Sequence, residues 1–239
     1  MDYVLLLRRA QSLYCCCNSA VGLTIRQKVL GHSGGFYCYR LHAHKLKKLC
    51  NGFTPLAEYL QTVFDQCPDQ YFNSGPRSSA LKFRLPLAPN YVAGHEVSTL
   101  ASWGLLQNKE RYRDAHSKVQ MFMLENDNNT IAMEVPLWLH AHEFDGYQTI
   151  FQSNEPLSGH IDVLRLEDEK IWIWDYKPNA HKEKYAATQV YFYAIMLSKR
   201  TGIPLEQFRC GYFDHNHSYV FKPEQNILLE NSTLQRFGP

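Results

Sequence analysis

The sequence predicts an α/β fold in which a mixed central β-sheet is flanked by helices. Apolar and polar residues alternate over residues 131–139, which is the period of a half-buried strand. Two further strand-like segments, 159–166 and 171–177, are joined by the polar turn 167–170 and predict a hairpin. A long helical segment follows over residues 184–200. Strand, hairpin and helix in this order indicate helices packed in layers on a mixed sheet.

The ends of these elements carry signals of their own. Pro136 interrupts the first strand, which predicts either an edge strand or a bulge at that position. Gly202 and Pro204 terminate the long helix, because glycine favours the position after a helix and proline cannot continue one. Residues 208–213 and 219–221 then predict a second hairpin.

The first part of the chain is patterned differently from the rest. We expect residues 1–90 to form a mainly helical N-terminal extension and residues 91–239 to form the core of the protein. Thr54 as an N-cap and Pro55 at the first helical position, followed by an apolar stripe, predict one helix of the extension. Residues 97–124 are expected to be helical in two pieces, broken near Gly104.

Composition excludes some classes of protein. The chain has 239 residues, of which 45% are hydrophobic and 13% aromatic, so it can bury a large core and is not a disordered protein. The net charge of +2 does not indicate a strongly basic nucleic-acid binder, although a local basic groove is compatible with it. Seven cysteines, three of them adjacent, do not form a disulfide framework and indicate a reducing compartment. No segment is long enough to span a membrane, so we expect a soluble, cytoplasmic protein.

The predicted hairpin brings together the residues with the clearest chemistry. Asp175 and Lys177 lie two residues apart and therefore on one face of their strand. Asp162 lies on the partner strand, so that the two carboxylates can meet. Two close carboxylates repel each other, and a divalent cation removes that conflict. Mg²⁺ and Mn²⁺ favour such oxygen ligands, and the neighbouring amine can then assist an attacking water or stabilise a phosphate.

Three short motifs occur in order on the strand, the next strand and the following helix: Gly159-x-x-Asp162, Asp175-x-Lys177 and Gln189-x-x-x-Tyr193. Together they resemble the PD-(D/E)xK phosphodiesterase superfamily and, within it, the RecB-like exonuclease branch. The resemblance covers about residues 110–222. It implies a restriction-endonuclease-like core around the mixed sheet.

Transferred to this chain, the resemblance implies a role for each motif residue. Asp162 and Asp175 would be metal ligands, and the backbone carbonyl of Tyr176 would complete the site. Lys177 would be the catalytic lysine. The metal would be Mg²⁺ or Mn²⁺, and in-line attack of water on a phosphodiester bond would be the reaction.

The helix after the hairpin adds candidate substrate-binding residues. The resemblance places Gln189 and Tyr193 beside the site, in contact with DNA or with the catalytic groups, although Tyr193 can equally be a core residue. Lys182 and Lys184 precede this helix and are suited to contact phosphates.

Two upstream residues are further candidate ligands. The branch usually supplies a helical histidine to the metal, and His116 lies at a similar distance before the strand of residues 131–139. The glycine usually found four residues before that histidine is replaced by Tyr112, and His95 is the rival. Glu134 either binds the metal directly or contacts a residue that does. The alternative is that it is a solvent-facing strand residue.

The resemblance implies a metal-dependent deoxyribonuclease, acting as an exonuclease or on DNA ends in repair, recombination or mobile-element replication. Its partner would be single-stranded DNA or duplex ends. No iron–sulfur cluster is expected, because Cys210 is the one cysteine after Lys177. Two alternatives stay open: a protein that binds DNA or a partner without cutting, and a sequence-specific restriction-type endonuclease whose recognition domain would have to lie in residues 1–90.

Overall fold

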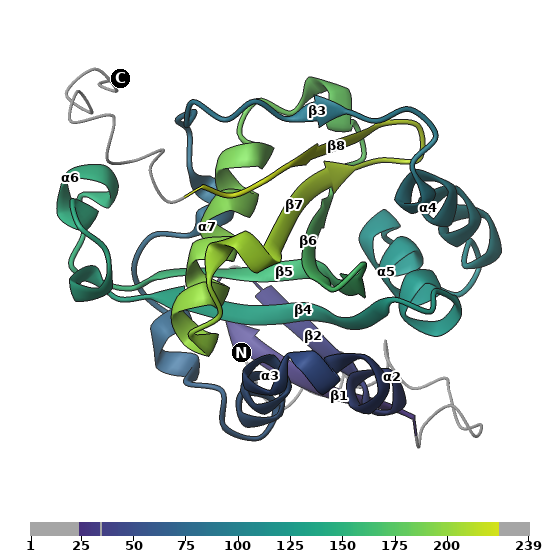
Figure 1. Ribbon diagram of the computed structural model, residues 1–239, viewed down its shortest axis with the longest axis horizontal. Helices are drawn as coiled ribbons and strands as arrows, with labels where there is room; N and C mark the ends of the chain where they lie inside the picture. Colours follow the sequence, from purple (N-terminus) through teal and green to yellow (C-terminus); the bar gives the residue numbers. More distant parts are fainter. Residues whose placement is uncertain (1–23, 34, 225–239) are drawn as a thin grey trace, which may run out of the picture.

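The computed structural model describes residues 24–33 and 35–224, and these residues form one eight-stranded sheet (Figure 1). Its order is β1-β2-β4-β5-β6-β7-β8-β3; β6 and β7 are parallel, and the other neighbours are antiparallel. The predicted mixed sheet is therefore confirmed. The strands are β1 (Ile25–His32), β2 (Gly35–His42), β3 (Asn90–Tyr91), β4 (Thr130–Leu139), β5 (Leu157–Glu167), β6 (Lys170–Tyr176), β7 (Phe208–Phe213) and β8 (Ser218–Phe221).

Helices cover both faces of the sheet (Figure 1). On one face α7 connects β6 to its parallel neighbour β7, as a parallel pair requires a crossover. On the other face α4 and α5 pack together, and α5 contacts β4 and β5. The helices are α2 (Ala43–Leu49), α3 (Thr54–Gln66), α4 (Glu96–Gln107), α5 (Ala115–Asn126), α6 (Tyr147–Phe151) and α7 (Ala186–Thr201). None of the described helices is long and apolar enough to cross a membrane.

The alternation of side chains along β6 builds a core on each side of the sheet. Ile171 and Ile173 belong to the large cluster that includes the buried face of α7. Trp174 and Tyr176 belong to a second cluster with α4 and α5. Burying one such side chain contributes roughly 1.5–3 kcal/mol to the free energy of folding. The two cores therefore fix the position of β6, and with it Asp175 near its end and Lys177 just after it.

The N-terminal region differs from the expected, mainly helical extension. Residues 25–32 and 35–42 pair as the β1–β2 hairpin, and β2 pairs with β4 at Arg40 and Leu41, so this segment extends the sheet. The strand pattern is weak because β1 is an edge strand whose exposed side carries Val29 and Gly31, whereas Arg26 and Lys28 lie on its partly buried side. Residues 43–90 do contain α2, α3 and short 3₁₀ turns. The boundary at residue 90 stays a prediction.

The break between α4 and α5 lies at residues 108–114 and not near Gly104, which is within α4. A Cβ atom on Gly104 would lie 2.9 Å from the Cα of Val119 in α5. The glycine therefore allows two helices to approach closely, and it does not end one.

Four cysteines lie within the described part of the chain, and all four are free thiols. Cys38, Cys50 and Cys210 are buried, and Cys67 is partly buried. The adjacent Cys15, Cys16 and Cys17, and the apolar run before Arg8, lie outside the described residues.

Candidate active site

The two aspartates meet where β5 and β6 begin to separate. Val163 of β5 is the last residue paired with β6, at Trp174, and the next positions along this register are Asp162 and Asp175. The backbone N–H of Tyr176 donates to Oδ2 of Asp162 at 2.9 Å. The Asp162 side chain thus occupies the opening between the strands, and the two carboxylates lie on the same side, as the hairpin predicts.

Glu134 completes a group of three carboxylates. The pairs Met133–Val163 and Val135–Ile161 flank it, which places Glu134 opposite Asp162 on the neighbouring strand. Its φ of 54° is in the left-handed region, a conformation that costs on the order of 1–3 kcal/mol for a residue with a side chain. Such strain is retained where the surrounding structure fixes it, and functional sites are frequent among those places.

The left-handed residue coincides with a reversal of the strand faces. Met133 and Val163 pack against residues of α5, whereas Val135 and Ile161 belong to the core on the α7 side. Side chains two residues apart normally share a face, so β4 and β5 rotate between these pairs. Glu134 and Asp162 lie at that rotation.

Pro136 is accommodated because β4 is locally an edge. The described pairing of β2 with β4 ends at Met133. The carbonyl of Pro136 accepts a hydrogen bond from the Tyr59 hydroxyl at 2.7 Å, on the side away from β5. The nitrogen of an antiparallel residue points to the same side as its carbonyl, so the missing N–H of Pro136 removes no bond to β5.

The carboxylates repel one another electrostatically. Burial and the nearby Asp162 carboxylate raise the pKa of Glu134 to about 8. Burial and the Asp175 carboxylate raise the pKa of Asp162 to about 6. Oxygen donors whose negative charges are mutually unfavourable are what a divalent cation stabilises, so the chemistry of this donor set suits such an ion.

Lys177 lies directly beside this group. Its Nζ is 2.7 Å from Oδ2 of Asp175, and its backbone N–H donates to the carbonyl of Phe213 at 2.8 Å. Burial opposes the charged amine, but the Asp175 and Asp162 carboxylates outweigh it and raise the pKa of Lys177 above its ordinary value. The side chain is therefore an ammonium ion in this arrangement.

Gln189 and Tyr193 are both on α7, and Gln189 lies next to Asp175. The side-chain amide of Gln189 donates to Oδ1 of Asp175 at 3.2 Å and to the Tyr193 hydroxyl at 2.8 Å. Both side chains are buried. A Cβ atom on Gly159 would lie 2.5 Å from Cε1 of Tyr193, so the glycine of the first motif makes room for this tyrosine. Gln189 thus contacts one of the two motif aspartates, and Tyr193 contacts Gln189.

His116 reaches the site from the first turn of α5. Its Nε2 lies 3.8 Å from Oδ2 of Asp162, and its ring packs edge-on to Tyr176. The rival His95 caps α4 by accepting a hydrogen bond from the Val97 N–H, and its ring lies 5.0 Å from that of Trp174. Of the two histidines, the structure thus brings His116 to the aspartates and gives His95 a structural contact.

The two lysines before α7 are not part of the buried site. Lys182 ends a short 3₁₀ turn, Lys184 follows it, and both side chains are exposed. They lie between the end of β6 and the start of α7, so they flank the same edge of the sheet as Lys177.

Two residues at the site were missed in the sequence. Gln120 donates to Oε1 of Glu134 at 2.7 Å, and the Ser78 hydroxyl, which lies beside Gly159, donates to the carbonyl of Ser158 at 3.1 Å. Gln120 follows His116 by one helical turn, so the spacing of four residues on α5 was an available signal. Ser78 lies on a separate 3₁₀ turn far away in the sequence, and no local pattern indicates its position.

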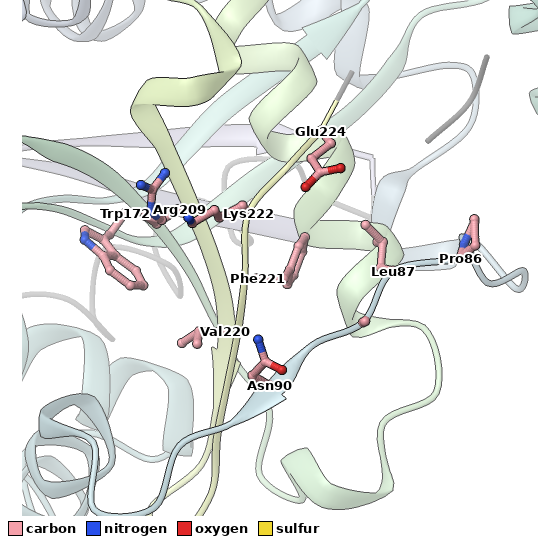
Figure 2. A pocket seen from close by; sticks show the side chains of 10 residues that line it. Pro86, Leu87, Asn90, Trp172, Arg209, Val220, Phe221, Lys222 and Glu224 are labelled. Atoms are coloured by element: carbon pink, nitrogen blue, oxygen red, sulfur yellow. The ribbon is translucent and has the colours of Figure 1, made fainter. Parts of the chain in front are cut away.

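A separate groove lies toward the other end of β6. Trp172, Arg209, Val220 and Lys222 line it together with the segment before β3 (Figure 2). Trp172 is paired with Arg209 near the start of β6, whereas Asp175 lies near its end. This groove contains Glu224 but no pair of carboxylates, so it has no equivalent of the group at the strand opening.

A mixed sheet with clustered carboxylates and a lysine where two central strands separate defines a hydrolase of the restriction-endonuclease-like fold. The sequence matches the PD-(D/E)XK nuclease superfamily over residues 38–235, and the chain belongs to that superfamily. The match begins within β2, so it includes part of the N-terminal hairpin. A search of curated proteins found no match.

Proposed function

We propose that this nuclease is a Mg²⁺- or Mn²⁺-dependent deoxyribonuclease of the RecB-like type, acting as an exonuclease or on DNA ends in repair, recombination or mobile-element replication. The observation that supports this most directly is the convergence of Asp162, Asp175 and Glu134 beside the ammonium of Lys177. Superfamily membership supplies phosphodiester hydrolysis as the reaction.

The carboxylates of Asp162, Asp175 and Glu134 would hold the cation, with the backbone carbonyl of Tyr176 and the imidazole of His116 as further ligands. When bound, the cation supplies Lewis-acid chemistry at the phosphate. From the described residues, Oδ2 of Asp175 accepts no hydrogen bond of normal geometry and is balanced by the Lys177 charge alone. That oxygen is therefore available as a ligand.

The ammonium of Lys177 suits one of the roles considered for it, the stabilisation of charge at the phosphate. It can donate hydrogen bonds to the attacking water or to a phosphate oxygen, and so stabilise the negative charge that develops there. Its backbone is bonded to β7 and its Nζ is paired with Asp175, so the ammonium is held in position before substrate binds.

Gln189 and Tyr193 act as positioning residues in this proposal. The amide of Gln189 holds Asp175 in place, and the Tyr193 hydroxyl holds the amide. Lys182 and Lys184, which are exposed at the same edge of the sheet, would contact the phosphate backbone of the substrate.

Three DNA substrates, two linear and one circular, test the proposal. The full chain is incubated with linear single-stranded, linear duplex and closed circular DNA in Mn²⁺, with chelator as the control. Loss of the linear substrates with intact circles supports the exonuclease. Cutting of circles at fixed sites would favour the restriction-type endonuclease instead, and retained binding without metal-dependent cutting would favour the non-cutting protein.

A further inference from the structure

A second group of metal-ligating side chains lies away from the nuclease site. It joins the last residue of β1 to the segment that follows α3. Nε2 of His32 lies 3.0 Å from Oδ1 of Asp69 and 3.9 Å from Sγ of Cys67. The three ligand atoms all lie within 4.8 Å of one another. An imidazole, a thiol and a carboxylate therefore converge on one point.

The His32 ring is fixed by its surroundings. Its side chain is fully buried, and it stacks on Phe72 with ring centres 4.0 Å apart. Its other nitrogen, Nδ1, lies 2.8 Å from Nε2 of His160. With the proton on Nδ1, His32 donates to His160 and directs its Nε2 lone pair toward Cys67 and Asp69.

This is the arrangement of a histidine that binds a metal. Metal-binding histidines commonly donate their second nitrogen to an acceptor, which fixes both the tautomer and the orientation of the ring. Here His160 is the acceptor. It is 4% exposed, and its ring stacks on Tyr37 with ring centres 3.8 Å apart. The Nδ1 atom of His160 has no hydrogen-bond partner among the described residues. His160 can therefore carry its proton on Nδ1 and accept the hydrogen bond from His32 at Nε2.

We propose that His32, Cys67 and Asp69 bind a divalent transition-metal ion, with Zn²⁺ the favoured ion. A nitrogen, a sulfur and an oxygen donor suit Zn²⁺, whereas Mg²⁺ and Mn²⁺ prefer oxygen donors. The proposal is therefore independent of the carboxylate site, which has no sulfur donor among its described ligands.

The ligand separations agree with a tetrahedral ion. Metal bonds of about 2.0–2.3 Å imply ligand atoms roughly 3.3–3.7 Å apart, and the separations of 3.0 and 3.9 Å lie on either side of that range. Small side-chain rotations bring both to it. The Asp69 side chain is 54% exposed, so water can occupy the fourth position from the solvent side.

The location indicates what such an ion would do. It would join the end of β1 to the chain that follows α3. The Arg26–Asp65 ion pair already joins β1 to the last turn of α3. Through His160 it would also contact β5, two residues before Asp162. A bound ion would thus fix the hairpin and the strand that carries the candidate active site relative to each other.

Cobalt spectroscopy tests the site without measuring nuclease activity. The full chain, freed of metal by chelator, is titrated with Co²⁺. We expect one equivalent to give a sulfur-to-cobalt charge-transfer band, which Zn²⁺ displaces and excess Mg²⁺ does not. Cys67→Ser should lose the band. Asp69→Asn, at an exposed position, should fold normally and bind Co²⁺ at least ~10-fold more weakly.

Cys50→Ser is the matched control, because Cys50 is a buried thiol of the same region outside the cluster. It should retain the band and the stoichiometry of the unaltered protein. A chain that gives no thiolate band, or whose band persists in Cys67→Ser, would overturn the proposal. In either case the Mn²⁺ cleavage assay is unaffected, so failure here is distinguishable from failure of the nuclease proposal.

Discussion

The Lys177 ammonium and the Asp175 carboxylate form an ion pair at the end of β6, with Nζ 2.7 Å from Oδ2. The pair concentrates opposite charges at the point where β5 and β6 separate. In the proposed mechanism Lys177 makes two contributions, one to the electrostatics of the site and one to the chemistry of cleavage.

Lys177→Met tests the second contribution. Methionine keeps the length of the side chain and removes the charge, so we expect folding and Mn²⁺ binding to be retained while cleavage falls by at least ~100-fold, the scale of losing one group that acts in proton transfer or charge stabilisation. Single-turnover cleavage and Mn²⁺ titration of the same preparation measure the two effects. A variant that cuts at the rate of the unaltered protein would remove Lys177 from the mechanism.

Gly159→Ala tests the close contact beneath the site. The added Cβ would meet Tyr193 and Ser78, so β5 or the tyrosine must move. We expect a loss of about 1–3 kcal/mol in the free energy of unfolding, the usual cost of overpacking, together with a large loss of cleavage. Gly52→Ala is the control, since nothing lies within 4 Å of its added Cβ. Equal unfolding midpoints for the two variants would contradict this account.

Gln120→Leu tests whether Glu134 takes part in metal binding. The substitution removes the amide that donates to Glu134 at 2.7 Å while keeping a side chain of similar size. Loss of such a supporting hydrogen bond typically weakens metal affinity by about 10–100-fold, and we expect that range for Mn²⁺. Calorimetric titration measures it. Unchanged affinity would mean that Glu134 is not a ligand.

The pH dependence of stability follows from the raised pKa of Glu134. In the unfolded chain this group ionises near its ordinary pKa of 4.5, but in the folded chain near 8. The folded state therefore holds the extra proton between these values, and the stability that it contributes is lost as pH rises toward 8. We expect the metal-free protein to lose thermal stability as the pH rises from about 4.5 to about 8.

Added Mn²⁺ should reverse this loss, because the cation stabilises the ionised carboxylates. The rise in unfolding temperature on adding Mn²⁺ should be larger at pH 8.5 than at pH 6.5. Glu134→Gln is the control, and in this variant the difference between the two pH values should shrink. A metal effect that is the same at both values in the unaltered chain would count against the proposed ligand role.

Much of the sheet could be predicted because its signals are local. The alternation over residues 131–139 corresponds to β4, the hairpin of residues 159–177 to β5 and β6, and the predicted long helix to α7. These segments are buried on defined faces, and burial imposes a period on the sequence. The motif spacing also indicates that Asp162 and Asp175 converge, since a hairpin has few possible registers.

The β1–β2 hairpin and Gly104 could not be predicted in the same way. In β1 the exposed side carries Val29 and Gly31 and the partly buried side carries Arg26 and Lys28, so the strand shows no alternation to detect. The glycine of α4 has its reason in a neighbouring helix. His116 and His95 are likewise similar as local patterns. Only the packing of α5 against the sheet brings one of them to Asp162.

The sequence by itself determined the class of fold and the aspartates and lysine of the candidate site, because these depend on strand periodicity and on spacing within one hairpin. The tertiary structure alone decided that Glu134 adopts a left-handed conformation opposite Asp162, that Gln189 holds Asp175, and that His32 meets Cys67 and Asp69. The physical reason is that each of these contacts joins elements far apart in the chain. Their geometry is set by how whole layers pack, which no short segment encodes.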